Sequence, residues 1–145
     1  MTEIENSLVQ QGYHAIAFRI RKSNHLYVSA KINGVKGVFL LDTGASNTCI
    51  DLNQQSFFQL TSNHSNTKAS GAGSNNLYTE ISKDNRIQLG KWKRSNTTFI
   101  LLDLNHVNVA LSQYKLPTVH GIIGSDLLKR HEALIHYPSR LLFMR

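Results

Sequence analysis

Apolar and polar residues alternate along several short segments of this 145-residue chain. The alternation has the period of two that is typical of half-buried β-strands, and it is clearest over residues 13–21 and 25–32. An Asn-Gly pair at 33–34 follows, and another apolar run covers residues 35–41. This order is typical of a hairpin with a type I′ turn. We therefore predict two strands joined by a tight turn, the second of which ends directly before Asp42.

Short strands are expected in the rest of the chain as well. They are predicted at residues 47–50, 77–81, 86–89, 97–104, 119–123 and in a final hairpin over 132–145. Two short helices are expected, one over residues 51–60 with Asp51 as its N-cap and one running to about residue 131 with Ser125 or Asp126 as its cap. The pattern predicts a mainly β fold.

The polar segment over residues 61–76 has a glycine-rich centre formed by Gly71, Ala72 and Gly73. Two interpretations remain open for it. It is either a disordered loop or a β-hairpin whose tip moves over a cleft.

Length and composition limit the architecture to one modest domain. The chain has 145 residues, 41% of them hydrophobic, which excludes a two-lobed enzyme of twice the size. We expect residues 13–145 to form the domain and residues 1–12 to form an arm or a short helix. Cys49 is the single cysteine, so no disulfide forms within the chain. The acidic N-terminus has no apolar signal region and no stretch is long enough to span a membrane, so a cytoplasmic protein is expected.

The basic charge of the chain raises the question of nucleic acid. The formal net charge is +7, and basic residues cluster at 19–22, 91–94 and 129–130. No ribonucleoprotein, zinc-finger or helix-turn-helix signature accompanies them, so we expect solvated faces and no nucleic-acid partner. The seven histidines show no metal-binding spacing, and no phosphate-binding loop is present. No metal and no cofactor are therefore expected.

Asp42 is the strongest candidate for chemistry. It lies between an apolar run and a Thr-Gly turn, a position expected to bury a carboxylate at a strand end. The alternative is an ordinary turn, because Asp caps its own backbone and Gly accepts positive φ. A second apolar motif, Gly-Ile-Ile-Gly at 121–124, follows about eighty residues later and leads into a predicted helix.

The Asp-Thr-Gly-Ala motif at 42–45, the glycine-rich segment and Gly-Ile-Ile-Gly together resemble the retropepsin-like aspartic proteases. The resemblance covers residues 13–145 and implies a closed, mostly β barrel with a hairpin flap and one or two short helices. It also implies an aspartic endopeptidase that binds a peptide or protein substrate. Since the chain has one such motif, a homodimer would supply the second carboxylate of the catalytic pair.

The resemblance further implies roles for individual residues. Asp42 would be catalytic, Thr43 would bond across the dimer axis, and the Gly44 amide would orient the carboxylate. Substrate-binding positions would be the apolar walls and the flap: Leu40, Ala45, Gly71, Ala72, Gly73 and Ile122.

Two positions depart from the pattern of the retroviral members. An acidic residue and an arginine that form an ion pair there are both serine here, Ser46 and Ser125, so the terminal strand over residues 141–144 is a candidate for holding the dimer. Two other functions are weighed against an endopeptidase. One is a non-catalytic dimeric peptide-binding module of the same fold, and the other is a basic nucleic-acid-binding domain.

Overall fold

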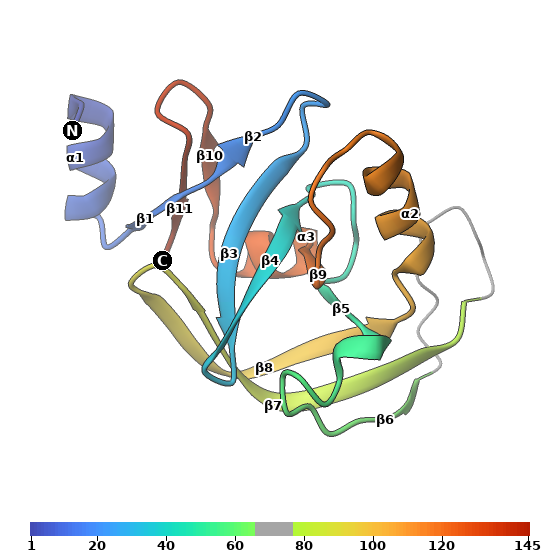
Figure 1. Ribbon diagram of the computed structural model, residues 1–145. Helices are drawn as coiled ribbons and strands as arrows, with labels where there is room; N and C mark the ends of the chain where they lie inside the picture. Colours follow the sequence, from blue (N-terminus) through green and yellow to red (C-terminus); the bar gives the residue numbers. More distant parts are fainter. Residues whose placement is uncertain (66–76) are drawn as a thin grey trace.

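A computed structural model describes residues 1–65 and 77–145, and it is built mainly from short strands (Figure 1). The elements are α1 (Glu3–Gln10), β1 (His14–Ala17), β2 (Arg19–Ile20), β3 (Leu26–Ile32), β4 (Val35–Leu41), β5 (Cys49–Asp51), the 3-10 helix η1 (Leu52–Gln54), β6 (Asn63–Ser65), β7 (Thr79–Leu89), β8 (Trp92–Leu102), α2 (Asn105–Gln113), β9 (Gly121–Ile123), α3 (Ser125–Arg130), β10 (Leu134–His136) and β11 (Leu141–Met144).

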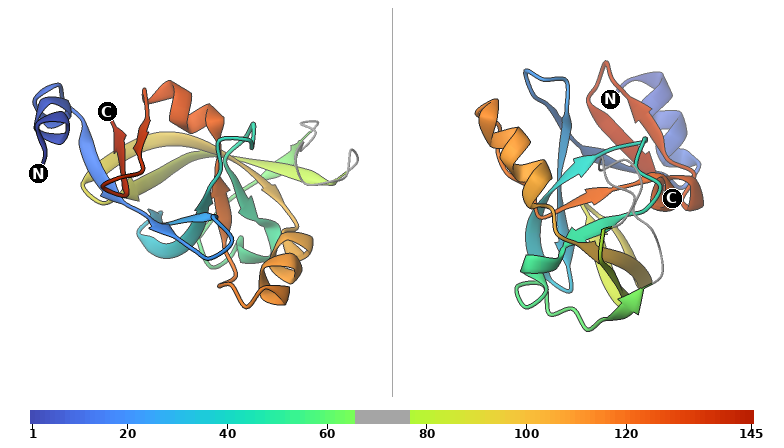
Figure 2. Two further views of the ribbon diagram at one scale, coloured as in Figure 1. Left: turned by 90° about the horizontal axis from the view of Figure 1, so that it is seen from above. Right: turned by 90° about the vertical axis from the view of Figure 1, so that its right-hand side faces the viewer.

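The larger sheet closes on itself to form a barrel. Its strand order is β2-β3-β4-β9-β5-β8-β7-β6, and an additional pairing joins β3 to β7. That pairing connects β3, β4, β9, β5, β8 and β7 into a ring, which confirms the predicted closed, mainly β architecture. A smaller sheet of order β1-β11-β10 lies beside the barrel. Helices α1 and α2 lie on opposite sides of the molecule (Figures 1 and 2).

The β3–β4 hairpin forms as the sequence predicts. Its two strands pair from Leu26 with Leu41 to Ile32 with Val35. Asn33 and Gly34 both have positive φ, 51° and 83°, as a type I′ turn requires. The hairpin therefore fixes where β4 ends and the Asp42 loop begins.

Alternate residues of β4 face two apolar clusters. Phe39 and Leu41 belong to the main core, which also contains the fully buried Trp92. Leu40 belongs to a second cluster together with Cys49 and Ile122. Since successive side chains of a strand point to opposite faces, one short strand stabilises both clusters.

Four sequence-based predictions need correction. The strand expected over residues 13–21 is split at Phe18, so that β1 joins the small sheet and β2 the large one. The helix expected over 51–60 is a single 3-10 turn, although Asp51 does cap it by accepting from the Asn53 amide. The segment 90–95 is mostly strand, because β7 and β8 are joined by a two-residue turn. Residues 105–118, between the strands predicted at 97–104 and 119–123, were expected to contain no helix or strand but include helix α2.

The helix after β9 is capped differently from the prediction. The N-cap of α3 is Gly124, and no side chain caps it. The alternative of a short N-terminal helix is the one observed, since α1 covers Glu3–Gln10 and begins with a capping box between Thr2 and Glu5. Within the described ranges, no helix is long and apolar enough to cross a membrane.

Candidate active site

Asp42 begins a tight turn directly after β4. Its amide donates to the carbonyl of Ile123 at 3.0 Å, which ties the strand end to β9. The Gly44 amide donates to Asp42 Oδ1 at 2.8 Å, and the Ala45 amide donates to the Asp42 carbonyl at 3.2 Å. A Cβ at Gly44 would lie 3.2 Å from Asp42 Oδ1, so glycine permits this close approach. The carboxylate is thereby held by the backbone of its own loop.

The Asp42 loop is exposed in the single chain. Asp42, Thr43 and Gly44 are all exposed, whereas Leu41 is buried. The expectation that the strand end buries the acid is wrong for the single chain. The reason is that the last buried residue of β4 is Leu41, after which the turn leads the chain outward.

Strand β9 passes between β4 and β5 beneath the loop. It pairs in parallel with β4, Leu41 opposite Ile123, and antiparallel with β5, Cys49 opposite Ile122. A Cβ at Gly121 would meet the carbonyl oxygen of Cys49 at 2.4 Å. One at Gly124 would meet backbone oxygens at 2.7 and 2.8 Å. Glycine at both positions therefore allows the backbones to approach this closely.

Thr48 and Asp126 connect the Asp42 loop to helix α3. Asp126 Oδ1 accepts from the amide and the hydroxyl of Thr48, each at 2.8 Å. Thr48 Oγ1 in turn accepts from the Gly124 amide at 3.0 Å. The Ser125 amide also donates to the carbonyl of Ala45, at 2.7 Å. The sequence offered no signal for this network beyond Asp126 near a helix start.

The three predicted apolar wall residues come together in one cluster. Leu40 and Ile122 are buried members of the second cluster, at 6% and 9% exposure, and Ala45 packs against it half-buried. The predicted flap positions Gly71, Ala72 and Gly73 lie outside the described residues. Strands β6 and β7, which pair antiparallel from Ser65 opposite Thr79, stand on either side of that segment.

A pocket of about 260 Å³ opens next to Asp42 and Thr43. Its other lining residues come from β3 and β4, from the β2–β3 turn and from the C-terminal hairpin: Asn24, His25, Leu26, Leu40, Leu41, Ile135 and Tyr137. Sequence reasoning missed His25, since a single histidine in a turn carries no motif. Ser23 Oγ lies 2.5 Å from His25 Nδ1 and fixes the ring orientation.

In the part of the chain that the structure describes, Asp42 is accompanied by neither a cluster of metal-ligating side chains nor a reactive thiol. Among the residues that the structure describes, no group of three or more His, Cys, Asp or Glu side chains is placed to hold a metal. Burial raises the pKa of the Cys49 thiol to about 12, with a further contribution from Asp126. A thiol that remains protonated at neutral pH is a poor nucleophile.

His120 contacts the middle of β4 and the two phenylalanines that follow η1. Its Nδ1 accepts from the Val38 amide at 3.0 Å, and its ring stacks on Phe57 with the centroids 5.5 Å apart. Burial lowers the pKa of His120, opposed by the nearby Asp51 carboxylate. We therefore assign His120 a structural role in packing and not a role in the chemistry at Asp42.

A comparison with models of known protein families shows to which family this chain belongs. Residues 28–127 match the family model described as aspartyl protease, and the match contains both Asp42 and the Gly121–Ile123 strand. The chain belongs to the aspartyl protease family. No curated protein gives a significant match to this family member.

Solved structures show the same fold. A retropepsin-like aspartic protease from Rickettsia conorii is 22% identical with a TM-score of 0.59, over 92% of this chain and 89% of that one. The EIAV protease in complex with the inhibitor HBY-793 is 18% identical with a TM-score of 0.58, over 81% and 98%. The retroviral protease-like domain of Ddi1 from Leishmania major is 20% identical with a TM-score of 0.55, over 83% and 87%. This aspartyl protease family member therefore has the retropepsin-like fold.

Proposed function

We propose that this protein is an aspartic endopeptidase that works as a homodimer, with Asp42 of each copy forming the catalytic pair. The observation that carries the proposal is the loop itself. It presents one carboxylate at a strand end, oriented by the Gly44 amide and exposed on the protomer surface. The chain has a single Asp-Thr-Gly motif, and a two-fold axis places the same residue twice.

The two Asp42 carboxylates, close to the two-fold axis, have different roles in the reaction. They share one proton because both cannot ionise at low cost, an effect for which aspartic proteases are themselves the standard example. The charged carboxylate takes a proton from a water, whose oxygen attacks the peptide carbonyl carbon. The neutral carboxylic acid donates a hydrogen bond to the carbonyl oxygen, and a proton then passes to the departing amine. Neither a metal nor a covalent enzyme intermediate is needed.

The surrounding residues support binding of a peptide. Leu40, Ala45 and Ile122 are proposed as apolar subsite walls, because they form one cluster beneath the loop. Thr43, exposed beside Asp42, is proposed to bond across the axis. The segment that contains Gly71, Ala72 and Gly73 is proposed as the flap, since it joins the paired strands β6 and β7.

A peptide library with wild-type protein and Asp42→Asn tests the proposal. We expect the substitution to lower the cleavage rate by about a thousandfold or more, because it removes the carboxylate that takes the proton. Asp84→Asn is the matched control, since Asp84 is an exposed aspartate on β7, and it leaves the rate unchanged. A statine-type inhibitor abolishes the wild-type activity. Cleavage unaffected by Asp42→Asn would contradict the proposal, and inhibitor binding without turnover would indicate a peptide-binding module instead.

A further inference from the structure

A row of basic residues crosses four strands of the barrel. Lys36 on β4 lies opposite Lys31 on β3, Lys31 lies opposite Gln88 on β7, and Gln88 lies opposite Lys93 on β8. Residues directly opposite one another project from the same face of a sheet. The three lysines are exposed and Gln88 is half-buried. At the usual spacing between strands the row is about 14 Å long.

Two arginines beside this row complete a hollow of about 530 Å³. Its lining contains Lys31, Arg86, Gln88, Lys93 and Arg94, with no acidic residue. The Arg94 guanidinium lies 5.0 Å from the ring centroid of Trp92, and its Nη1 donates to the Lys93 carbonyl at 2.6 Å. These contacts hold Arg94 in place on the surface.

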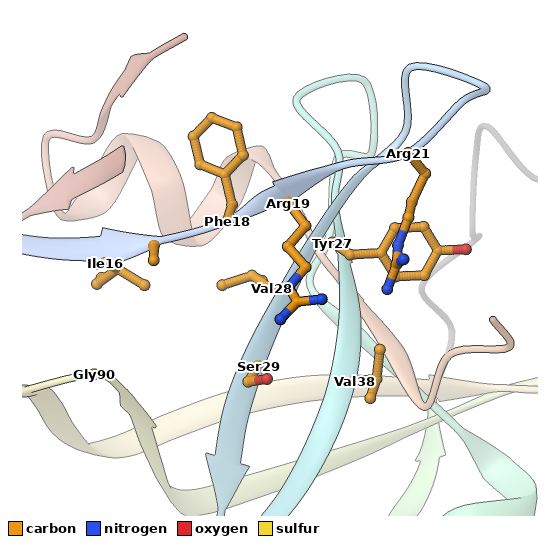
Figure 3. Close-up of a pocket in the computed structure, with 10 residues that line it drawn as sticks. Ile16, Phe18, Arg19, Arg21, Tyr27, Val28, Ser29, Val38 and Gly90 are labelled. Atoms are coloured by element: carbon orange, nitrogen blue, oxygen red, sulfur yellow. The ribbon is translucent and has the colours of Figure 1, made fainter. Parts of the chain in front are cut away.

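A second basic hollow continues the same face along β3 and β4. It measures about 480 Å³, and Arg19 and Arg21 reach into it over Ser29 and Val38 (Figure 3). Ser29 and Val38 are opposite each other and lie two residues from Lys31 and Lys36, so both hollows open on one side of the hairpin.

Arg21 lies against an aromatic ring and, within the described ranges, has an unsatisfied guanidinium nitrogen. Its guanidinium carbon lies 5.3 Å from the centroid of the buried Tyr27 ring, and its Nε is a buried nitrogen that has no hydrogen-bond partner among the described residues. A planar guanidinium offers paired donors that match a carboxylate. No acidic residue lines this hollow either.

The positive charges gathered on this face repel one another and lower the stability of the fold. Equal charges directly opposite each other, as at Lys31 and Lys36, destabilise a sheet pair. In the described part of the chain the one ion pair joins Arg145 to Glu132, and neither residue lines the two hollows. An anionic partner would remove this repulsion.

We propose that this basic face, formed by Arg19, Arg21, Lys31, Lys36, Arg86, Gln88, Lys93 and Arg94, is an exosite that binds an acidic segment of protein substrates. Its hollows have the size of short peptide stretches and mix cations with apolar residues such as Val38 and Ile87. Single-stranded nucleic acid usually stacks on exposed aromatic rings, whereas Trp92 and Tyr27 are buried here. An acidic peptide is therefore the better fit.

The position of the face relative to Asp42 agrees with this role. Strand β4 carries Lys36 near its start and leads directly to Asp42, and six residues of strand span roughly 20 Å. An extended substrate covers that distance with about six residues. The role in cleavage rests on the proposed endopeptidase function, whereas binding itself does not.

Binding is tested with the inactive Asp42→Asn protein and two labelled decapeptides, one with alternating Glu and Gly and one with alternating Gln and Gly. At low salt we expect fluorescence anisotropy to show at least tenfold tighter binding of the Glu peptide. Lys31→Gln combined with Lys93→Gln lowers that affinity at least tenfold. The matched control, Lys115→Gln with Lys129→Gln, removes the same charge from exposed sites on other elements and changes it less than twofold. An equal loss in the control, or tighter binding of a DNA strand or duplex at the same lysines, overturns the proposal.

A cleavage experiment separates this proposal from the endopeptidase function. A peptide that the wild-type protein cleaves is extended by a Glu-rich or a Gln-rich tail about eight residues from the cleaved bond. The Glu tail is expected to lower KM and leave kcat unchanged, and the lysine double variant removes the difference. Equal KM values for both tails would overturn the exosite while the endopeptidase stands. If no peptide is cleaved, the endopeptidase proposal fails, and the anisotropy measurement still decides binding.

Discussion

Single residues decide how closely the backbones around Asp42 pack. Gly121 lies opposite Phe39 on one side and Ile50 on the other, in the middle of three paired strands. The oxygen that a side chain at Gly121 would meet belongs to the backbone, which cannot swing aside as a side chain can. The position therefore requires glycine because of space, and not because of an unusual φ.

Gly121→Ala is predicted to destabilise the protein by about 3 kcal/mol or more, since the added Cβ overpacks the strand. Urea unfolding followed by circular dichroism measures the change. Gly90→Asn is the control, because its nearest neighbour would be 3.7 Å away and asparagine tolerates the positive φ found there. A loss at Gly121 no larger than that at Gly90 would contradict the close approach of β9 to β5.

His120 is predicted to make stability depend on pH. Burial lowers its pKa below the ordinary value of 6.5, so the unfolded chain binds a proton more readily than the folded one. The free energy of unfolding should therefore fall as the pH drops below about 6.5, until the folded state is protonated too. Protonation also removes the acceptor of the Val38 amide.

Urea unfolding of wild-type and His120→Gln protein at several pH values between 7 and 5 tests this pH dependence. The variant should lose less stability over that range than the wild type does. His131, whose pKa is also lowered by burial and by Arg94 and Arg130, continues to contribute in both proteins. If the free energy of unfolding falls as steeply with pH in the variant as in the wild type, His120 does not contribute to the pH dependence.

At the scale of elements, the sequence predicted best where local chemistry sets the geometry. The Asn-Gly turn placed β3 and β4 correctly because both positions need positive φ. The Gly-Ile-Ile-Gly run indicated β9 followed by a helix, and both are present. Helix α2 was missed because Asn, His and β-branched residues dominate it and no side chain caps its start.

Features that depend on distant residues could not be predicted from the sequence. The split at Phe18 arises because the residues before it pair with β11, far along the chain, whereas Arg19 and Ile20 pair with β3. The bond between Thr48 and Asp126 joins residues 78 positions apart, and only the folded barrel brings them together. The Asp42 loop was identified by its motif. The hydrogen bonds that hold it through Thr48 and Asp126, and the neighbouring His25, were not identified.

Thr48→Val is predicted to loosen the Asp42 loop by removing a hydroxyl that bonds both Asp126 and the Gly124 amide. We expect a loss of about 1–3 kcal/mol, because buried partners lose their hydrogen bonds. Amide hydrogen exchange at Gly124 and urea unfolding measure the effect. Thr48→Ser keeps the hydroxyl and should recover most of the loss, and a Ser variant as unstable as the Val variant would show that the methyl group is what matters.

At the scale of the whole molecule, one strand limits how two copies can meet. Strand β11 is paired on both sides within the chain, with β1 and with β10. Its hydrogen bonds are therefore already satisfied, and the expected use of residues 141–144 as a shared strand would need a free edge at β1 or β10 instead. Leu134, the first residue of β10, and Tyr137, directly after its end, are exposed at 43% and 57% and make that edge the more apolar candidate.

Mixing subunits tests whether two copies form the active site. Wild-type protein is combined with Asp42→Asn protein, denatured together and refolded to allow random pairing. If each site needs Asp42 from both copies, equal mixing leaves about a quarter of the dimers fully wild type. The activity per total protein should then fall to about that fraction, rather than to one half. Adding a large excess of Asp42→Asn protein should suppress the wild type almost completely.

The same mixing with Asp84→Asn protein is the control, and it should leave full activity because both partners keep Asp42. Activity that falls only in proportion to the wild-type fraction would show that a single chain carries a complete site. That result would contradict the shared catalytic pair while leaving the fold and the family unaffected, since neither depends on the number of copies.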